Sequence, residues 1–153
     1  MEQSLLLALP DDALLAVLAF LPPRQLLSCR VLCRRLRDLC LHPDLWRRVR
    51  VLRWKDHDLW RSAFRLAPCL RELDISGNHL RGAASEVSRT SCVVAKLTLS
   101  VATTHEVTFA TAIVEKVSAL GGLEQLVLDI VRREGAVDVN GLLGGSVQGR
   151  PSP

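Results

Sequence analysis

Aromatic residues are scarce in this chain of 153 residues, which contains three Trp, three Phe and no Tyr. Hydrophobic residues nevertheless make up 48% of the sequence, so we expect a packed core built mostly from leucine. The five cysteines are an odd number without paired spacing, which argues against a secreted disulfide scaffold. The sequence predicts one domain, or a small helical module joined to a partial second one.

Long apolar runs and export signals are also lacking. The apolar run at residues 13–21 is far shorter than the ~20 residues that span a bilayer. A secretory signal would begin with basic residues, whereas Glu2 precedes the first apolar residues and Asp11 and Asp12 interrupt them. We therefore expect an intracellular chain, cytoplasmic or nuclear, without a membrane partner.

Patterns typical of catalytic and metal sites are missing as well. The four histidines are scattered, none is paired with a Ser or Cys at an informative spacing, and there is no Gly-rich phosphate loop. Cys29, Cys33 and Cys40 would share one helical face with His42 nearby, but the spacing fits no zinc pattern and free cysteine packs well as a small hydrophobe. The sequence predicts a non-catalytic protein without a metal or cofactor.

Residues 9–48 have the periodicity of three short helices. The first would begin with two Asp residues after Pro10, where carboxylates favour a helix N-terminus, and would end at Pro22–Pro23. The second would cover residues 26–40, and the third would restart after His42-Pro43. The apolar positions expected to face inward are Leu14, Val17, Leu18, Leu21, Leu26, Cys29, Leu32, Cys33, Leu36, Leu39, Cys40, Leu45, Trp46 and Val49.

The first of these helices has no solvent side. Its opposite face carries Ala13, Leu15, Ala16 and Phe20, so both faces are apolar. A helix of this kind must be buried all round, yet a unit of about 50 residues hides only ~60% of the surface that its unfolded chain exposes. The excess apolar surface predicts an interface with a partner protein or with the rest of the chain.

From residue 49 onward the period changes to the alternation typical of strands. Four short segments carry paired anchors: Val49/Val51, Leu73/Ile75, Leu97/Leu99 and Leu126/Leu128. Successive anchors are 24, 24 and 29 residues apart, which resembles the period of leucine-rich repeats. The second copy comes nearest to the full repeat pattern, with Leu70, Leu73, Ile75, Asn78 and Leu80. Each repeat would add one strand to a parallel sheet.

The segments between these strands would supply helices on the convex side. "TFATAIVEKVSAL" is one example, with Phe109, Ile113, Val117 and Leu120 facing inward. Residues 134–153 are rich in Gly, Ser and Pro without periodicity, which predicts a disordered, flexible tail. No polar capping repeat follows Leu128, so we hypothesise a shortened form of a longer repeat protein.

The N-terminal unit closely resembles an F-box. The resemblance rests on "LPDDALLAVLAFL", "PPRQLLSCRVLCRRLRDL" and "HPDLWRRV", in that order. With the repeats, the chain is similar to the F-box/leucine-rich-repeat family. The fold class this implies is α+β: a three-helix F-box at 5–49, a short and possibly truncated leucine-rich-repeat solenoid (α/β) at 50–133, and a tail at 134–153.

The resemblance implies a substrate-receptor subunit of an SCF-type cullin-RING ubiquitin ligase. The F-box would dock on a Skp-type adaptor and, through it, on the cullin scaffold and RING subunit, while the repeats would bind a protein substrate. The adaptor-binding residues that it implies are Leu9, Pro10, Leu14, Leu15, Leu18, Leu26, Leu32, Cys33, Leu45 and Trp46. The substrate-binding candidates lie between the strand anchors: Arg50, Asp74, Thr98 and Val127.

Two other functions remain open. Eight arginines and only two acidic residues lie between Arg30 and Arg53, a balance that would suit a nucleic-acid-binding helical domain. A chain with a truncated repeat array would instead bind the adaptor without a substrate and act as a competitor. Trp54, Trp60 and Phe64 would form a recognition patch or, as we favour, pack the junction between the helical unit and the first repeat.

Overall fold

The computed structural model describes residues 5–52, 58–76 and 79–131. The N-terminal elements are helical: η1 (Leu5–Ala8), α1 (Asp11–Leu18), α2 (Pro23–Cys29), α3 (Arg34–Leu39) and α4 (Pro43–Trp46). The following elements alternate: β1 (Arg50–Val51), α5 (Leu59–Leu66), β2 (Cys69–Ser76), α6 (His79–Glu86), η2 (Val87–Arg89), β3 (Val93–Val101), α7 (Thr104–Leu120) and β4 (Gln125–Ile130). The chain is therefore mixed helix and strand, with its helices first, as predicted.

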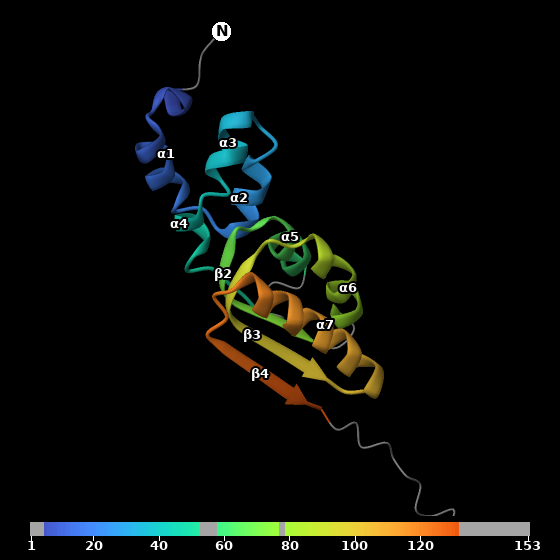
Figure 1. Cartoon of the computed structure of the whole chain (residues 1–153). Helices are drawn as coiled ribbons and strands as arrows, with labels where there is room; N and C mark the ends of the chain where they lie inside the picture. The colour runs from blue at the N-terminus through green and yellow to red at the C-terminus, as the bar shows by residue number, and fades with distance from the viewer. Residues whose placement is uncertain (1–4, 53–57, 77–78, 132–153) are drawn as a thin grey trace, which may run out of the picture.

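The strands form one parallel sheet in the order β1-β2-β3-β4, with α5, α6 and α7 on one side of it (Figure 1). The register matches the predicted anchors from the second strand onward, because Leu73 pairs with Leu97 and Leu97 with Leu126. At the first strand it differs by two residues: Val51, and not the expected Val49, pairs with Leu73, and β1 does not include Val49. Alternate residues of β2 and β3 are buried against the helices because successive side chains of a strand point to opposite faces. The four predicted strands are confirmed, while the leucine-rich-repeat solenoid stays a prediction.

The N-terminal helical unit differs from the three-helix prediction. The expected helix over 26–40 is interrupted between Cys29 and Arg34, so four α-helices form. Cys33 has an extended backbone and caps α3, its Sγ accepting a bond from the Leu36 amide at 3.4 Å. Cys29, Cys33 and Cys40 therefore do not share one helical face. The interruption turns Leu32, expected to face inward, out to solvent.

The first helix is also shorter than its apolar run. α1 ends at Leu18, and Pro22 and Pro23 start α2 as its N-cap and first helical residue instead of ending α1. Proline suits that position because the first N–H groups of a helix have no partner within it. Leu14 and Leu18 are buried as predicted, whereas Val17 is exposed.

One cluster of buried side chains connects the helical unit to the sheet. It extends from Leu14 and Trp46 through Val51 and Phe64 to Val117. Trp60 and Phe64 belong to it, as the packing interpretation predicted, and Trp54 lies outside the described residues. Asn78 and residues 132–153 lie outside them as well. The helical unit and the sheet are thus built around a shared core.

A complete capping box starts α7. Thr103 Oγ1 accepts a bond from the Glu106 amide at 3.3 Å, and Glu106 Oε2 accepts one from the Thr103 amide at 3.1 Å. These reciprocal bonds satisfy amides that have no partner within the helix. The buried residues of α7 are Ala110, Ile113 and Val117, so the predicted inward face is confirmed at two of its four positions. The helix ends at Gly121, whose φ of 81° favours glycine.

Removing this cap has a predictable cost. We expect Thr103→Ala to lower the free energy of unfolding by about 1 kcal/mol, because the Glu106 amide loses the Thr103 hydroxyl as an acceptor and keeps only the Thr103 carbonyl. Urea denaturation of the whole chain measures the change. Thr104→Ala is the matched control, since Thr104 is the exposed neighbour inside the helix. Equal stability of the two variants would contradict a stabilising cap.

Candidate protein–protein interface

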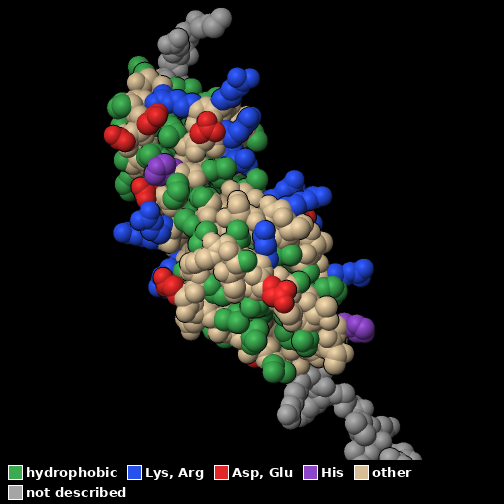
Figure 2. Space-filling view, viewed as in Figure 1, with side chains coloured by type: hydrophobic (Ala, Val, Ile, Leu, Met, Phe, Trp, Pro, Cys, Tyr) green, Lys and Arg blue, Asp and Glu red, His purple; other side chains and the backbone are tan. Residues whose placement is uncertain are grey.

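Large hydrophobic side chains reach the surface in two separate regions. Of the twelve exposed ones in the described residues, seven lie in the N-terminal helical unit: Leu5, Leu6, Leu7, Val17, Phe20, Val31 and Leu32. The other five lie on α7, on β4 and just after it: Val107, Leu126, Leu128, Ile130 and Val131. In the space-filling view, hydrophobic side chains are visible at both ends of the described chain (Figure 2). Exposed apolar surface of this kind marks candidate interaction sites.

The exposed apolar residues of the N-terminal helical unit lie around a core that the unit packs from its own side chains. α1 buries Leu14 and Leu18, whereas Val17 is exposed and Phe20, just beyond the end of the helix, is 89% exposed. Leu32, in the link between α2 and α3, is 70% exposed. The chain itself thus leaves the opposite face of the apolar N-terminal run open. This is the surface for which the sequence predicted a partner.

The predicted adaptor-binding residues fall into three classes of burial. Leu14, Leu18, Leu26 and Trp46 are buried in the chain's own core. Leu9, Leu15, Cys33 and Leu45 are half-buried. Pro10 and Leu32 are exposed. A rigid partner can contact the last two classes directly, whereas the first class supports the surface from beneath.

Sequence reasoning missed several exposed residues of this region. The list comprises Leu5, Leu6, Leu7, Val17 and Val31, none of which was assigned to the adaptor. Phe20 was placed on the opposite face of the first helix, so the apolar run was the signal that pointed to it. For Val31 no such signal exists, because its exposure depends on the break between α2 and α3.

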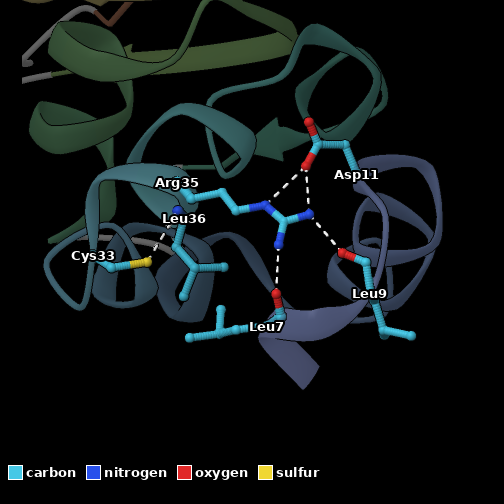
Figure 3. A network of polar contacts seen from close by, with 6 residues as sticks. All are labelled: Leu7, Leu9, Asp11, Cys33, Arg35 and Leu36. Atoms are coloured by element: carbon cyan, nitrogen blue, oxygen red, sulfur yellow. Dashed lines mark hydrogen bonds and ion pairs between the residues drawn. The ribbon is translucent and has the colours of Figure 1, made fainter. Parts of the chain in front are cut away.

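Arg35 joins α3 to the segment that precedes α1 (Figure 3). Its Nε and Nη2 donate to Asp11 Oδ1 at 2.9 and 2.6 Å. Nη1 donates to the Leu7 carbonyl and Nη2 to the Leu9 carbonyl, both at 2.6 Å. The guanidinium thus contacts three acceptors that lie 24 to 28 residues before it. No local sequence pattern indicates this long-range contact.

The predicted substrate-binding residues lie on the sheet, away from α1. Asp74 pairs with Thr98, and Thr98 with Val127, so these three form one row across β2, β3 and β4. Arg50 lies in a different row, opposite Glu72 of β2. The structure therefore brings three of the four predicted residues together and places the fourth beside them.

The row that contains Arg50 is an ion-pair ladder across three strands. Glu72 Oε1 lies 2.9 Å from Lys96 Nζ, and Glu72 Oε2 lies 3.5 Å from Arg50 Nε. Glu72 is the most enclosed of the three side chains. Opposite charges on neighbouring strands stabilise their register, so these groups have a structural role besides any binding.

The second exposed apolar region is a groove between α7 and β4. It has a volume of about 510 Å³, and Val101, Val107, Val114, Leu126, Leu128 and Ile130 are among its lining residues. The equivalent rows of β2 and β3 are covered by helices, whereas Leu128 of β4 is 55% exposed. Within the described residues, this edge of the sheet has no covering helix.

Several arginines between Arg30 and Arg53 already have acidic partners. Arg35 pairs with Asp11, Arg47 Nη2 lies 3.0 Å from Asp44 Oδ1, and Arg50 lies beside Glu72. The basic side chains seen in Figure 2 are spread over the viewed face, not gathered into one stripe. A nucleic-acid-binding surface needs a continuous basic patch, so this arrangement disfavours that alternative.

Three cysteine thiols are held in their neutral form. Burial raises the pKa of Cys92 to about 12, and burial is also the main cause that raises the pKa values of Cys40 and Cys69. A nucleophilic thiol requires the opposite shift. Among the described residues, no group of three or more His, Cys, Asp or Glu side chains is arranged to hold a metal ion. In the same part of the chain, no helix is long and apolar enough to cross a membrane.

Comparison with known families identifies the helical unit. Residues 6–51 match the F-box-like family model, a range that covers most of η1, helices α1 to α4 and β1. No solved structure matches the chain. F-box domains bind Skp-type adaptors and are typically non-catalytic parts of SCF complexes, so the match supports adaptor binding. Residues 6–51 of the chain therefore form an F-box-like domain.

Proposed function

We propose that this chain is a non-catalytic substrate-receptor subunit of an SCF-type cullin-RING ubiquitin ligase. Its F-box-like domain would bind a Skp-type adaptor, and the adaptor would link it to the cullin scaffold and RING subunit. The conjugating enzyme recruited to such a complex would carry the chemistry, and this subunit would contribute positioning. The role implies an intracellular location, in the cytoplasm, the nucleus or both.

The proposal rests on large apolar side chains of the helical unit that stay exposed although the core of this unit is already packed. The helical unit buries Leu14, Leu26 and Trp46, yet Phe20 and Leu32 remain exposed. Burying one large apolar side chain contributes about 1.5–3 kcal/mol, so a few such residues can stabilise a specific complex. An adaptor that covers this surface would bury the face of the apolar N-terminal run that the chain itself leaves exposed.

We propose that the parallel sheet binds the protein substrate. Leu70, Leu73 and Ile75 of β2 align with Val94, Leu97 and Leu99 of β3, and all six are buried. This L-x-x-L-x-L spacing, repeated in register, supports leucine-rich repeats. The face opposite the helices carries the row of Asp74, Thr98 and Val127, which we propose as the substrate surface.

Co-expression with a Skp-type adaptor tests the first half of the proposal. We expect the whole chain to copurify with the adaptor in a one-to-one complex and to add to an adaptor–cullin–RING assembly. Circular dichroism of the chain alone establishes that it is folded. A folded chain that fails to bind the adaptor at tens of micromolar would contradict the proposal.

The competitor alternative makes a different prediction about substrate. A receptor captures a protein substrate through the sheet, and Thr98→Arg in the middle of the row would abolish this capture without changing adaptor binding. A competitor binds the adaptor equally well but displaces other F-box proteins without capturing any substrate. Crosslinking of the assembled complex, compared between wild type and Thr98→Arg, separates the two roles.

A further inference from the structure

We propose that Arg35 is a positioning residue for the adaptor interface. Its side chain holds the η1 segment in the geometry that the adaptor binds, before the adaptor is present. This inference rests on the proposed adaptor binding. The residues it positions are the exposed leucines of η1 together with Leu9. Arg35 acts on them through their backbone and does not need to contact the adaptor itself.

The η1 segment has little else to hold it. No residue of Leu5–Ala8 is buried, so core packing does not fix this turn. A hydrogen bond from the Leu9 amide to the Leu6 carbonyl at 3.3 Å closes the turn at its C-terminal end. A single-turn helix with exposed side chains is only marginally stable in water. Its geometry must come from contacts with the rest of the chain.

Arg35 supplies contacts on both sides of the link between η1 and α1. It donates to the Leu7 carbonyl within η1, to the Leu9 carbonyl in the link, and to Asp11 in the first turn of α1. The acceptors all lie within 3 Å of guanidinium nitrogens. Because α3 is anchored in the core through Leu36, the guanidinium ties a segment without a core of its own to the packed helices.

The fork of the guanidinium is essential to this arrangement. Three nitrogens donate in one plane, and Nη2 serves the Leu9 carbonyl and Asp11 Oδ1 at once. A lysine ammonium has the same charge but is a point donor on a flexible stem, so it cannot reproduce this geometry. The neighbouring Arg34 and Arg37 are exposed residues of the same helix and provide matched controls.

Loss of these contacts should loosen the η1 segment without unfolding the chain. The Arg35–Asp11 pair is about one-third and two-thirds exposed, respectively, so its contribution to global stability is small. Affinity for the adaptor depends on the fraction of molecules whose interface is preformed. If Arg35→Ala lowers that fraction to about one-tenth, the dissociation constant for the adaptor rises about tenfold.

Hydrogen exchange of the free whole chain tests the first step. We compare wild type, Arg35→Ala, Arg35→Lys and the control Arg34→Ala by mass spectrometry of peptides covering residues 5–11. We expect exchange in this segment to accelerate about tenfold in Arg35→Ala, to a smaller extent in Arg35→Lys, and not at all in Arg34→Ala. Exchange in the buried strand β3 should stay unchanged in all four. Unchanged exchange of residues 5–11 in Arg35→Ala would overturn the proposal.

Adaptor titration of the same four proteins tests the second step. We expect the dissociation constant to rise about tenfold for Arg35→Ala and to stay within twofold of wild type for Arg34→Ala. Faster exchange with an unchanged dissociation constant would overturn the positioning role. If wild type itself does not bind the adaptor, the proposed function fails, and the exchange data still decide whether Arg35 orders η1.

Discussion

We expect Phe20→Asp to leave the chain folded and to weaken adaptor binding by about 100-fold or more. The fold does not depend on this ring, which is 89% exposed and lies just beyond the end of α1. In the complex the new carboxylate would face an apolar surface and lose its hydration. A cost of about 2.7 kcal/mol corresponds to a 100-fold change in the dissociation constant, and burying an unpaired charge costs at least that much. Leu32→Asp should behave in the same way.

Isothermal titration calorimetry with the adaptor measures the change in affinity, and thermal unfolding of the free chain measures whether the variant stays folded. The matched control is Val107→Asp, which makes the same kind of change at an exposed residue of α7. We expect Val107→Asp to bind the adaptor like wild type, because the groove beside α7 is remote from α1 (Figure 1). Wild-type affinity in both Phe20→Asp and Leu32→Asp would exclude the exposed helical surface as the interface.

The strands were the most predictable part of the fold. Alternation at Leu73/Ile75 and Leu97/Leu99, repeated at a fixed interval, requires that equivalent residues lie side by side, and the register shows that they do. The periodicity survives in β2 and β3 because one face of each of these strands is buried, and a slip by one residue would expose their anchors.

The break between α2 and α3 could not be predicted in the same way. Residues 26–40 have helical spacing throughout, yet Val31 and Leu32 are exposed and Cys33 is extended. Helical periodicity indicates which residues are apolar. It does not indicate whether these residues are buried by their own chain or by a partner protein. Intrinsic propensity is a weak prior that tertiary context overrides, and here the chain turns between two short helices.

The same ambiguity explains the mixed outcome at the candidate interface. A residue buried by its own core and a residue buried by a partner leave the same apolar signal, so Leu14 and Leu32 looked alike in the sequence. The structure separates them: Leu14 is fully enclosed and Leu32 is 70% exposed. The Arg35 contacts were beyond sequence reasoning for another reason, because the turn between the helices determines which acceptors come within its reach.

Trp46→Ala should lower the free energy of unfolding by about 3–5 kcal/mol, the usual cost of removing a buried Trp side chain. The ring of Trp46 has no exposed surface, and its Nε1 donates to the Cys40 carbonyl at 2.7 Å. The substitution leaves a large cavity and deprives a buried carbonyl of its donor. Single domains have a total stability of only about 5–15 kcal/mol, so part of the population would be unfolded at 37 °C. Urea denaturation measures this loss, with Trp46→Phe as the control that keeps most of the apolar volume.

Adaptor binding distinguishes a core role of Trp46 from a contact role. If the ring only supports the interface from within, the folded fraction of Trp46→Ala binds the adaptor normally, and cooling or a stabilising osmolyte restores the apparent affinity. If the ring contacts the adaptor, affinity stays low even where the variant is fully folded. The first outcome follows from its complete burial in the free chain. The second would require α4 to open on binding, because only then could the adaptor reach the indole.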